Sequence, residues 1–285
     1  MARVAVVTDS TATIPVPLLR NLPITICPLQ VCWDQAIYLD GVDIQPDDFY
    51  VRLSTSKTMP TSSQVTPAYF EKTYRSLAED GYDIISIHIS SKLSGTLDSA
   101  QQAKKVLPKT HIEIYDSEVT AMAMGWQVLA VARAAAEGAT LAECKSLEDQ
   151  AKTHSGVLFL LDTLEFLKRG GRIGGAAAFF GQAFHIKPIL ELRGGGIEPA
   201  DKVRTTNKAQ EKLLDILEQR IGKRIPIRLS SLHANAALQA ENMLERARGR
   251  FGISEVIETN ISVVSPVLGV HTGPGALGIA YMAGM

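Results

Sequence analysis

Cysteine is scarce in this sequence, and the spacing of its cysteines argues against a metal site. The chain has 285 residues and three cysteines, Cys27, Cys32 and Cys144. Their spacing fits no metal-binding motif, and an odd number leaves one thiol unpaired. Free thiols are typical of a reducing compartment. We therefore expect structural cysteines in a cytoplasmic protein.

Long apolar runs and a basic excess are also missing. Gly, Gln, Asp or Lys interrupts each apolar run before it reaches the roughly 18 residues that a membrane-spanning helix needs. The first residues lead directly into a strand pattern, which is unlike a signal peptide. The net charge is −1 and the pI about 6.6, whereas a nucleic-acid-binding domain is expected to be basic. We expect neither a membrane span nor a nucleic-acid partner.

Several motifs of common enzyme classes are absent. The sequence has no Walker loop, no GxSxG elbow and no HExxH pair, which argues against a Walker-type nucleotide hydrolase, an α/β-hydrolase and a zinc site. Residues 273–278 match GxGxxG formally. Too few residues follow this match to supply the strand and the acidic residue that a dinucleotide site needs.

The order of strand and helix patterns predicts a two-domain α/β protein, which the chain length also favours. Strands alternate with helices up to about residue 153, so residues 1–154 are expected to form a three-layer α/β/α domain with a mostly parallel sheet. Residues 155–285 contain a Gly-rich turn at 193–196 and a final extended segment at 276–282. They are expected to form a two-layer α/β domain with a mixed sheet.

Hydroxyl-rich segments occur at residues 8–11, 57–64 and 90–96. In open α/β sheets, ligands bind at the carboxyl ends of strands. The segment at 90–96 also leads into a helix whose first amide groups are free to meet an anion. Each hydroxyl alone is more often a helix cap than a ligand contact. Together with His271 in a glycine-rich segment, they predict the polar end of a pocket.

Residues 157–192 supply the apolar part of this prediction. Their apolar side chains lie on nearly all sides of the expected helix, whereas a surface helix has one apolar stripe. Small residues at 174–178 stand beside Phe179 and Phe180 and leave space. The stretch is either a simple core helix or the lining of a cavity. In the second case, the pocket suits an amphiphile with one acidic head group.

Six motifs in a fixed order give the chain a resemblance over almost its whole length. They are Thr61-Ser62-Ser63-Gln64, Leu93-Ser94-Gly95-Thr96, LKRGGRIG at 167–174, KPIL at 187–190, VRT at 203–205 and HTGPG at 271–275. With VVTDS at 6–10, the set resembles the DegV family of fatty-acid-binding proteins.

The resemblance implies a fold of two α/β domains that holds one long-chain fatty acid, such as palmitate, stearate or oleate, in a tunnel between them. It also implies a carrier subunit of a fatty acid kinase, whose separate ATP-binding subunit phosphorylates the bound carboxyl group to an acyl phosphate. Such a carrier is not itself an enzyme and has no catalytic residue, cofactor or metal. We expect a monomer that makes transient contact with a membrane.

Site residues follow from the resemblance and from the patterns above. Head-group binding is expected at Thr61, Ser62, Ser63, Ser94, Gly95, Thr96, His271 and Thr272. The acyl tunnel is expected at Leu158, Leu160, Leu164, Leu167, Ile173, Phe179, Phe180, Phe184 and Ile189. Contact with the kinase or the phosphate is expected at Arg169, Arg172 and Arg204. For Arg169 and Arg172, ion pairing with a residue such as Glu165 or Glu191 is an equal alternative.

Two other functions remain open. One is an acyl hydrolase or transferase with Ser94 as nucleophile and His271 as base, although no third group or elbow motif accompanies this pair. The other is a lipid-sensing regulatory protein with the same pocket.

Overall fold

A four-stranded parallel sheet forms the centre of the first half of the chain. The computed structural model describes residues 3–179 and 186–285. The sheet has the order β2-β1-β6-β7, and all its neighbouring strands run parallel. Its strands are β1 (Arg3–Asp9), β2 (Ile24–Cys27), β6 (Tyr82–His88) and β7 (Ile112–Asp116). The predicted parallel sheet is therefore confirmed.

Helices cover this sheet and connect its strands, as crossover connections between parallel strands require. Thr140 and Glu143 form a capping box at the start of α6, and Thr66 caps α3. The helices of this half are α1 (Val16–Leu19), α2 (Pro46–Thr55), α3 (Pro67–Glu79), α4 (Thr96–Lys105), α5 (Ala121–Ala136) and α6 (Leu141–His154), with a short 3₁₀ turn η1 (Ser10–Ala12) after β1.

A small antiparallel sheet extends the first half. It has the order β4-β3-β5 and consists of β3 (Gln30–Trp33), β4 (Ala36–Leu39) and β5 (Thr61–Ser63). A turn at Asp34, which has a positive φ of 56°, joins β3 and β4. Residues 57–64 were expected to form only a loop, but part of this segment pairs with β3 as β5.

The second half contains a six-stranded mixed sheet with the order β10-β9-β8-β13-β11-β12. Only β11 and β12 are parallel neighbours, and the other pairs are antiparallel. The predicted Gly-rich turn joins β9 to β10. The strands are β8 (Ser155–Leu160), β9 (Lys187–Arg193), β10 (Gly196–Val203), β11 (Ile227–His233), β12 (Val256–Val263) and β13 (Leu277–Ala283). The helical elements are α7 (Glu165–Arg169), the 3₁₀ turn η2 (Gly174–Phe179), α8 (Thr206–Ile221), α9 (Ala237–Arg248) and α10 (Pro266–Thr272).

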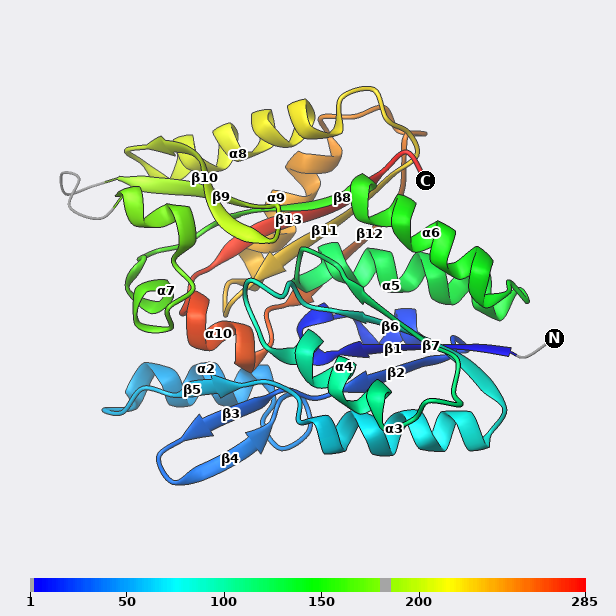
Figure 1. Cartoon of the computed structure of the whole chain (residues 1–285). Helices are drawn as coiled ribbons and strands as arrows, with labels where there is room; N and C mark the ends of the chain where they lie inside the picture. Colours follow the sequence, from blue (N-terminus) through cyan, green and yellow to red (C-terminus); the bar gives the residue numbers. More distant parts are fainter. Residues whose placement is uncertain (1–2, 180–185) are drawn as a thin grey trace.

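Helix α5 lies between the two large sheets (Figure 1) and contacts β1 on one side and β8 and β13 on the other. Of its 16 residues, 11 are buried, which explains why the helix is apolar on almost every side. The larger hydrophobic cluster contains residues of both halves, for example Val6, Trp126 and Val264. The two halves of the chain therefore share one continuous core.

A second hydrophobic cluster lies on the other face of the mixed sheet, beneath α8 and α9. The β8 strand separates the two clusters because successive side chains of a strand point to opposite faces. Val157 belongs to the larger cluster, whereas Leu158 and Leu160 belong to the second.

Candidate functional site

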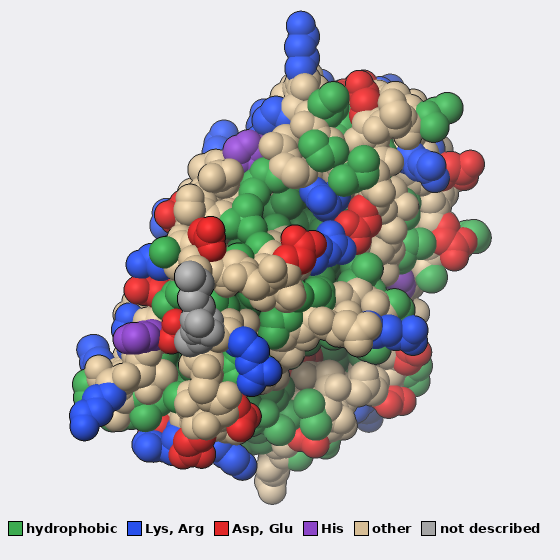
Figure 2. Space-filling view, turned by 90° about the vertical axis from the view of Figure 1, so that its right-hand side faces the viewer, with side chains coloured by type: hydrophobic (Ala, Val, Ile, Leu, Met, Phe, Trp, Pro, Cys, Tyr) green, Lys and Arg blue, Asp and Glu red, His purple; other side chains and the backbone are tan. Residues whose placement is uncertain are grey.

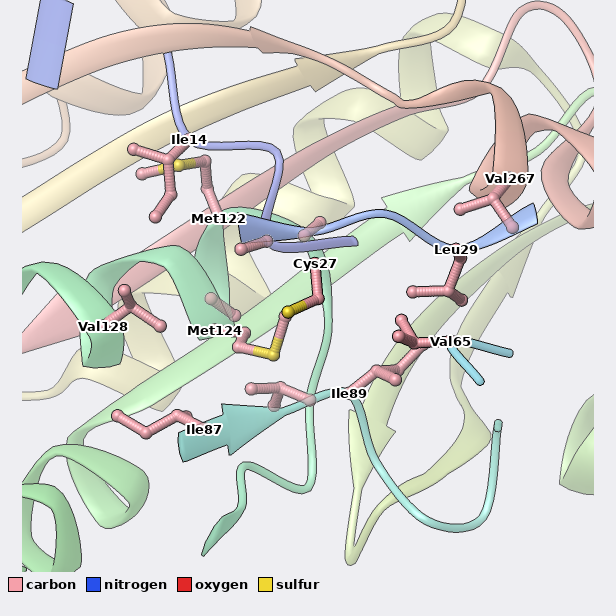
Figure 3. Packing of buried hydrophobic residues seen from close by; sticks show 14 of the residues in the cluster. Ile14, Cys27, Leu29, Val65, Ile87, Ile89, Met122, Met124, Val128 and Val267 are labelled. Atoms are coloured by element: carbon pink, nitrogen blue, oxygen red, sulfur yellow. The ribbon is translucent and has the colours of Figure 1, made fainter. Parts of the chain in front are cut away.

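A cavity of about 140 Å³ lies where the carboxyl ends of the parallel strands face the mixed sheet. Side chains from both halves line it. Figure 3 shows Leu29, Val65, Ile89 and Val267 converging from four separate segments of the chain, and three of these residues line the cavity. Aliphatic and aromatic side chains form most of its wall: Leu29, Ile89, Leu93, Val157, Phe159, Leu167, Leu192, Ile197, Leu232, Val264, Val267, Leu268 and Leu277.

Polar side chains gather at one part of this wall. Ser62 Oγ lies 2.7 Å from His271 Nε2, and Ser63, Gln64, Ser94, Arg172 and Thr272 line the same cavity. Ser94 Oγ accepts a hydrogen bond from the backbone N–H of Thr96 at 3.2 Å and lies 2.9 Å from the Thr96 hydroxyl. An apolar cavity with such a polar region has the form of an amphiphile site.

The imidazole of His271 is neutral at physiological pH. Burial, with the nearby guanidinium group of Arg172 as a second cause, lowers its pKa to about 4. Its Nδ1 atom is buried without a hydrogen-bond partner among the described residues. Because Nε2 faces Ser62, a tautomer protonated at Nε2 donates to the serine hydroxyl, which is then free to donate into the cavity.

Gly170 makes room for this histidine. A Cβ atom at Gly170 would lie 2.0 Å from His271 Nδ1, so any side chain there would force the histidine to move. The turn at Gly170 is held by Arg172, whose Nη1 donates to the Gly170 carbonyl at 2.6 Å and whose Nε donates to the Leu93 carbonyl at 3.0 Å. Arg172 thus joins the segment before Ser94 to the segment that packs on His271.

Asp9 fixes another part of the cavity wall. Its Oδ1 accepts hydrogen bonds from the hydroxyl group and backbone N–H of Thr11, at 2.5 and 3.1 Å. Its Oδ2 accepts from the backbone N–H of Ile89 at 3.0 Å and lies 3.1 Å from His88 Nδ1. Thr11 and Ile89 both line the cavity, so the hydroxyl-rich segment after β1 takes part in the site through a buried carboxylate.

The predicted head-group residues do not all reach the cavity. Ser62, Ser63, Ser94, His271 and Thr272 line it. Thr61 is exposed, Thr96 is buried as the first residue of α4, and Gly95 leaves space for Gln64, whose Oε1 would lie 2.6 Å from a Cβ there. Sequence reasoning did not single out Gln64, Thr11 or Thr120 as lining residues, although the first two lie in the hydroxyl-rich segments.

The structure places most of the expected tunnel residues away from the cavity. Leu167 lines it, whereas Leu158, Leu160 and Ile189 pack in the second cluster. Leu164, Ile173 and Phe179 are partly buried against the larger cluster, and Phe180 and Phe184 lie outside the described residues. The residues missed include Val157 and Phe159, whose place on the opposite face of β8 from Leu158 follows from the two-residue period of a strand.

The three arginines have different surroundings. Arg169 is exposed and pairs with Glu165 at 2.9 Å, one helical turn away, which is the ordinary alternative considered for it. Arg172 lines the cavity. Arg204 is exposed immediately before Thr205, the N-cap of α8. Glu191 pairs with Arg220 and Arg193.

The geometry does not assemble a nucleophile and base from Ser94 and His271. Ser94 contacts Thr96, while the histidine contacts Ser62. Over residues 3–179 and 186–285, no cluster of three metal-binding side chains occurs and no helix is long and apolar enough to cross a membrane. On the face shown in Figure 2, basic and acidic side chains are interspersed, so this face carries no basic patch.

Comparison with known proteins shows relatives of the same length. DegV domain-containing protein SCO2569 of Streptomyces coelicolor is 38% identical over 277 residues, which are 97% of each chain. Protein DegV of Bacillus subtilis is 34% identical over 280 residues, 98% of each chain.

Solved structures also resemble the whole chain. A DegV family protein from Thermus thermophilus, described for its fatty acid binding, has a TM-score of 0.91 and 32% identity, with 99% of each chain covered. DegV of Bacillus subtilis, described as a fatty acid binding protein, has a TM-score of 0.89 and 32% identity, covering 99% of this chain and 100% of that one. A family model described as "Uncharacterised protein, DegV family" matches residues 3–284. The chain therefore belongs to the DegV family.

Proposed function

We propose that the cavity binds one long-chain fatty acid, such as palmitate, stearate or oleate. The alkyl chain would lie along the aliphatic wall, and the carboxyl group would lie at Ser62, Ser94 and His271. The observation that carries this proposal is the contact of Ser62 with His271 in the polar part of a mostly apolar cavity. The fatty acid binding described for the Thermus thermophilus and Bacillus subtilis relatives supports it.

The alkyl chain would supply most of the affinity. Burial contributes roughly 0.8 kcal/mol per methylene, so about fourteen methylenes offer on the order of 11 kcal/mol before the costs of association. Hydrogen bonds to the head group contribute about 1 to 3 kcal/mol. The tail therefore determines how tightly the lipid binds, and the head group determines its direction.

Ser62 would connect the histidine to the lipid. The Nε2–H group of His271 donates to Ser62 Oγ, and the Ser62 hydroxyl then donates to the carboxylate. Ser94 offers a second hydroxyl, and Arg172 supplies a positive charge near His271. These donors offset the cost of removing a carboxylate from water.

We further propose that the protein acts as the carrier subunit of a fatty acid kinase and presents the carboxyl group to a separate ATP-binding subunit. Arg172 beside the head-group region and the exposed Arg204 are the candidates for contact with the transferred phosphate and the kinase. This role places the protein in the cytoplasm as a monomer, with catalysis in the kinase and transient membrane contact during lipid exchange. The hydrolase alternative has no support from the geometry of Ser94.

The direct test is to denature purified protein and identify the released molecules by mass spectrometry. The proposal expects an intact long-chain fatty acid in about one copy per chain. Its amount should fall when Val157, on the cavity wall, is replaced by Trp, and should remain when exposed Leu238 is replaced by Ala. Protein that carries no lipid and takes up none from added palmitate or oleate would refute the function.

A further inference from the structure

A carboxylate from the small antiparallel sheet caps the helix that carries His271. Asp40 directly follows β4 and is 2% exposed. Its Oδ1 accepts a hydrogen bond from the backbone N–H of Val267, in the first turn of α10, at 3.1 Å. The N-cap residue of α10, Ser265, makes no capping hydrogen bond with its own side chain. Asp40, from the other half of the chain, therefore accepts the hydrogen bond that an N-cap side chain usually accepts.

The cap and the histidine are close along the helix. Helix α10 is seven residues long, and Val267 and His271 are four residues apart, which is about one turn. A helix of this length does not hold its own conformation and depends on tertiary contacts. The contacts that hold α10 therefore also set the position of His271, one turn from the cap.

Helix α2 holds α10 from the same side. The Tyr50 hydroxyl donates to the carbonyl of Val264 at 3.0 Å, just before α10 begins. A Cβ atom at Gly269 would lie 2.6 Å from Phe49 Cε1 and 2.7 Å from Tyr50 Oη. Figure 1 shows α10 directly over α2. The helix thus has little freedom on this side, and the elements around Asp40 determine its position.

We propose that Asp40 is a positioning residue for the head-group site, because it caps α10 across the two halves of the chain and so sets the place of His271 against Ser62. The inference rests on the proposed function in one respect only, namely that His271 meets the lipid carboxyl group. Asp40 itself does not touch the lipid.

The groups that face Asp40 determine the conditions of a test. Its pKa is raised to about 6, mainly by burial and to a smaller extent by the carboxylate of Asp9, against the opposing effect of the hydroxyl groups of Ser10 and Ser265 and the N–H of Val267. Tyr50 lies beside it as a neutral phenol, because burial raises the pKa of that hydroxyl. At pH 8, Asp40 is ionised and the cap is complete, so measurements belong there.

The test compares two ligands with the same tail, palmitate and 1-hexadecanol. The ratio of their dissociation constants reports the head-group contacts. A change that affects both dissociation constants equally reports the contacts of the shared alkyl chain with the cavity. Asp40→Ala should lower the preference for palmitate about fivefold and leave alcohol affinity within about twofold. Asp40→Asn, which keeps an acceptor oxygen, should restore most of the preference. Asp48→Ala removes an exposed acid on α2 and should leave both affinities unchanged.

A double-mutant cycle shows whether the effect passes through His271. In protein that already carries His271→Ala, Asp40→Ala should cause no further loss of preference. An equal loss in both backgrounds would overturn the inference, as would an equal loss of acid and alcohol affinity. If Asp40→Ala does not fold, Gly269→Ala displaces the same helix from the α2 side and should lower the same ratio.

A second readout needs no lipid. The ring ¹⁵N signals of His271, assigned by their absence in His271→Ala, should shift in Asp40→Ala and remain in place in Asp48→Ala. Unshifted signals together with an unchanged ratio would overturn the inference. If the parent protein bound neither ligand, the proposed function would fail, and a shifted His271 signal would still support the role of Asp40 as a positioning residue.

Discussion

Ser62 Oγ and His271 Nε2 are 2.7 Å apart, although 209 residues separate them in the sequence. Ser62 lies in the small antiparallel sheet of the first half, and His271 lies near the end of α10 in the second half. The contact therefore joins the two halves of the chain at the polar edge of the cavity. Four predictions depend on this arrangement and on the cavity beside it, and a fifth concerns the exposed Arg204.

Ser62→Ala should weaken fatty acid binding and lower the free energy of unfolding by about 1 to 3 kcal/mol. The substitution leaves His271 Nε2 buried without its partner, and Nδ1 already has none among the described residues. Urea unfolding and palmitate titration measure the two effects. Thr61→Ala, at the exposed neighbouring position, is the matched control, and an equal loss there would contradict the assignment of Ser62.

Gly170→Ala should move His271, because the new Cβ atom would lie 2.0 Å from Nδ1. Forced contacts of this kind cost about 1 to 3 kcal/mol of stability. The loss, measured by thermal or urea unfolding, should shrink when His271 is also replaced by Ala. Gly249→Ala meets only ordinary contacts of 3.5 Å and serves as control. A cost for Gly170→Ala that persists unchanged without the histidine would disprove this explanation.

The contribution of His271 to stability should fall as the pH is lowered from about 6.5 to about 4. Burial, with Arg172 as a second cause, lowers the pKa of the folded-state imidazole to about 4, so in this interval the unfolded chain binds the additional proton. Stability is therefore complete above the unfolded pKa and is lost on acidification, by on the order of 3 kcal/mol. His271→Gln cannot titrate there, and the difference between its unfolding curves and those of the parent isolates the effect. A difference that does not change between pH 7 and pH 4 would contradict the low pKa.

Val157→Trp should reduce the affinity for palmitate by on the order of tenfold, because the larger side chain occupies space that the alkyl chain needs. Leu158 is the adjacent residue on the opposite face of β8. Leu158→Ala should cost about 2 to 5 kcal/mol of stability and leave the preference for acyl chain length unchanged. Titration with fatty acids of several lengths distinguishes the two results, and a changed length preference in Leu158→Ala would count against the observed cavity wall.

Arg204→Glu should weaken association with a fatty acid kinase ATP-binding subunit without changing the lipid content of the purified protein. Arg204 is exposed before α8 and does not line the cavity. Arg248→Glu reverses another exposed arginine, in the last turn of α9, and should leave association unchanged. Co-purification and lipid mass spectrometry measure the two properties. Equal association of both variants and the parent would remove Arg204 from the proposed interface.

Local patterns were sufficient for many elements of the fold, although not for β5, whose pairing with β3 they did not predict. The capping box at Thr140, the proline at the start of α3 and the apolar strand β6 depend on neighbours within a few residues, so their sequence determines them. The hydroxyl-rich segments identified Ser62 and Ser94 for the same reason, because such residues follow strands and precede helices. The glycine-rich segment around His271 added this histidine to the predicted pocket, and the resemblance to the DegV family assigned it to the head group.

The tertiary structure decided which of these side chains meet. Leu158 was expected in the tunnel and lies in the second cluster, since the position of β8 between two cores decides which face of the strand each residue occupies. The cap that Asp40 makes on α10 spans 227 residues, and the contact of Ser62 with His271 spans 209. The sequence by itself determined the strands, helices and hydroxyl-rich turns, whose hydrogen bonds close over short distances along the chain. Only the packing of both halves around α5 brought the serine, the histidine and the aliphatic wall together, because burial of apolar surface acts between segments without regard to their separation in sequence.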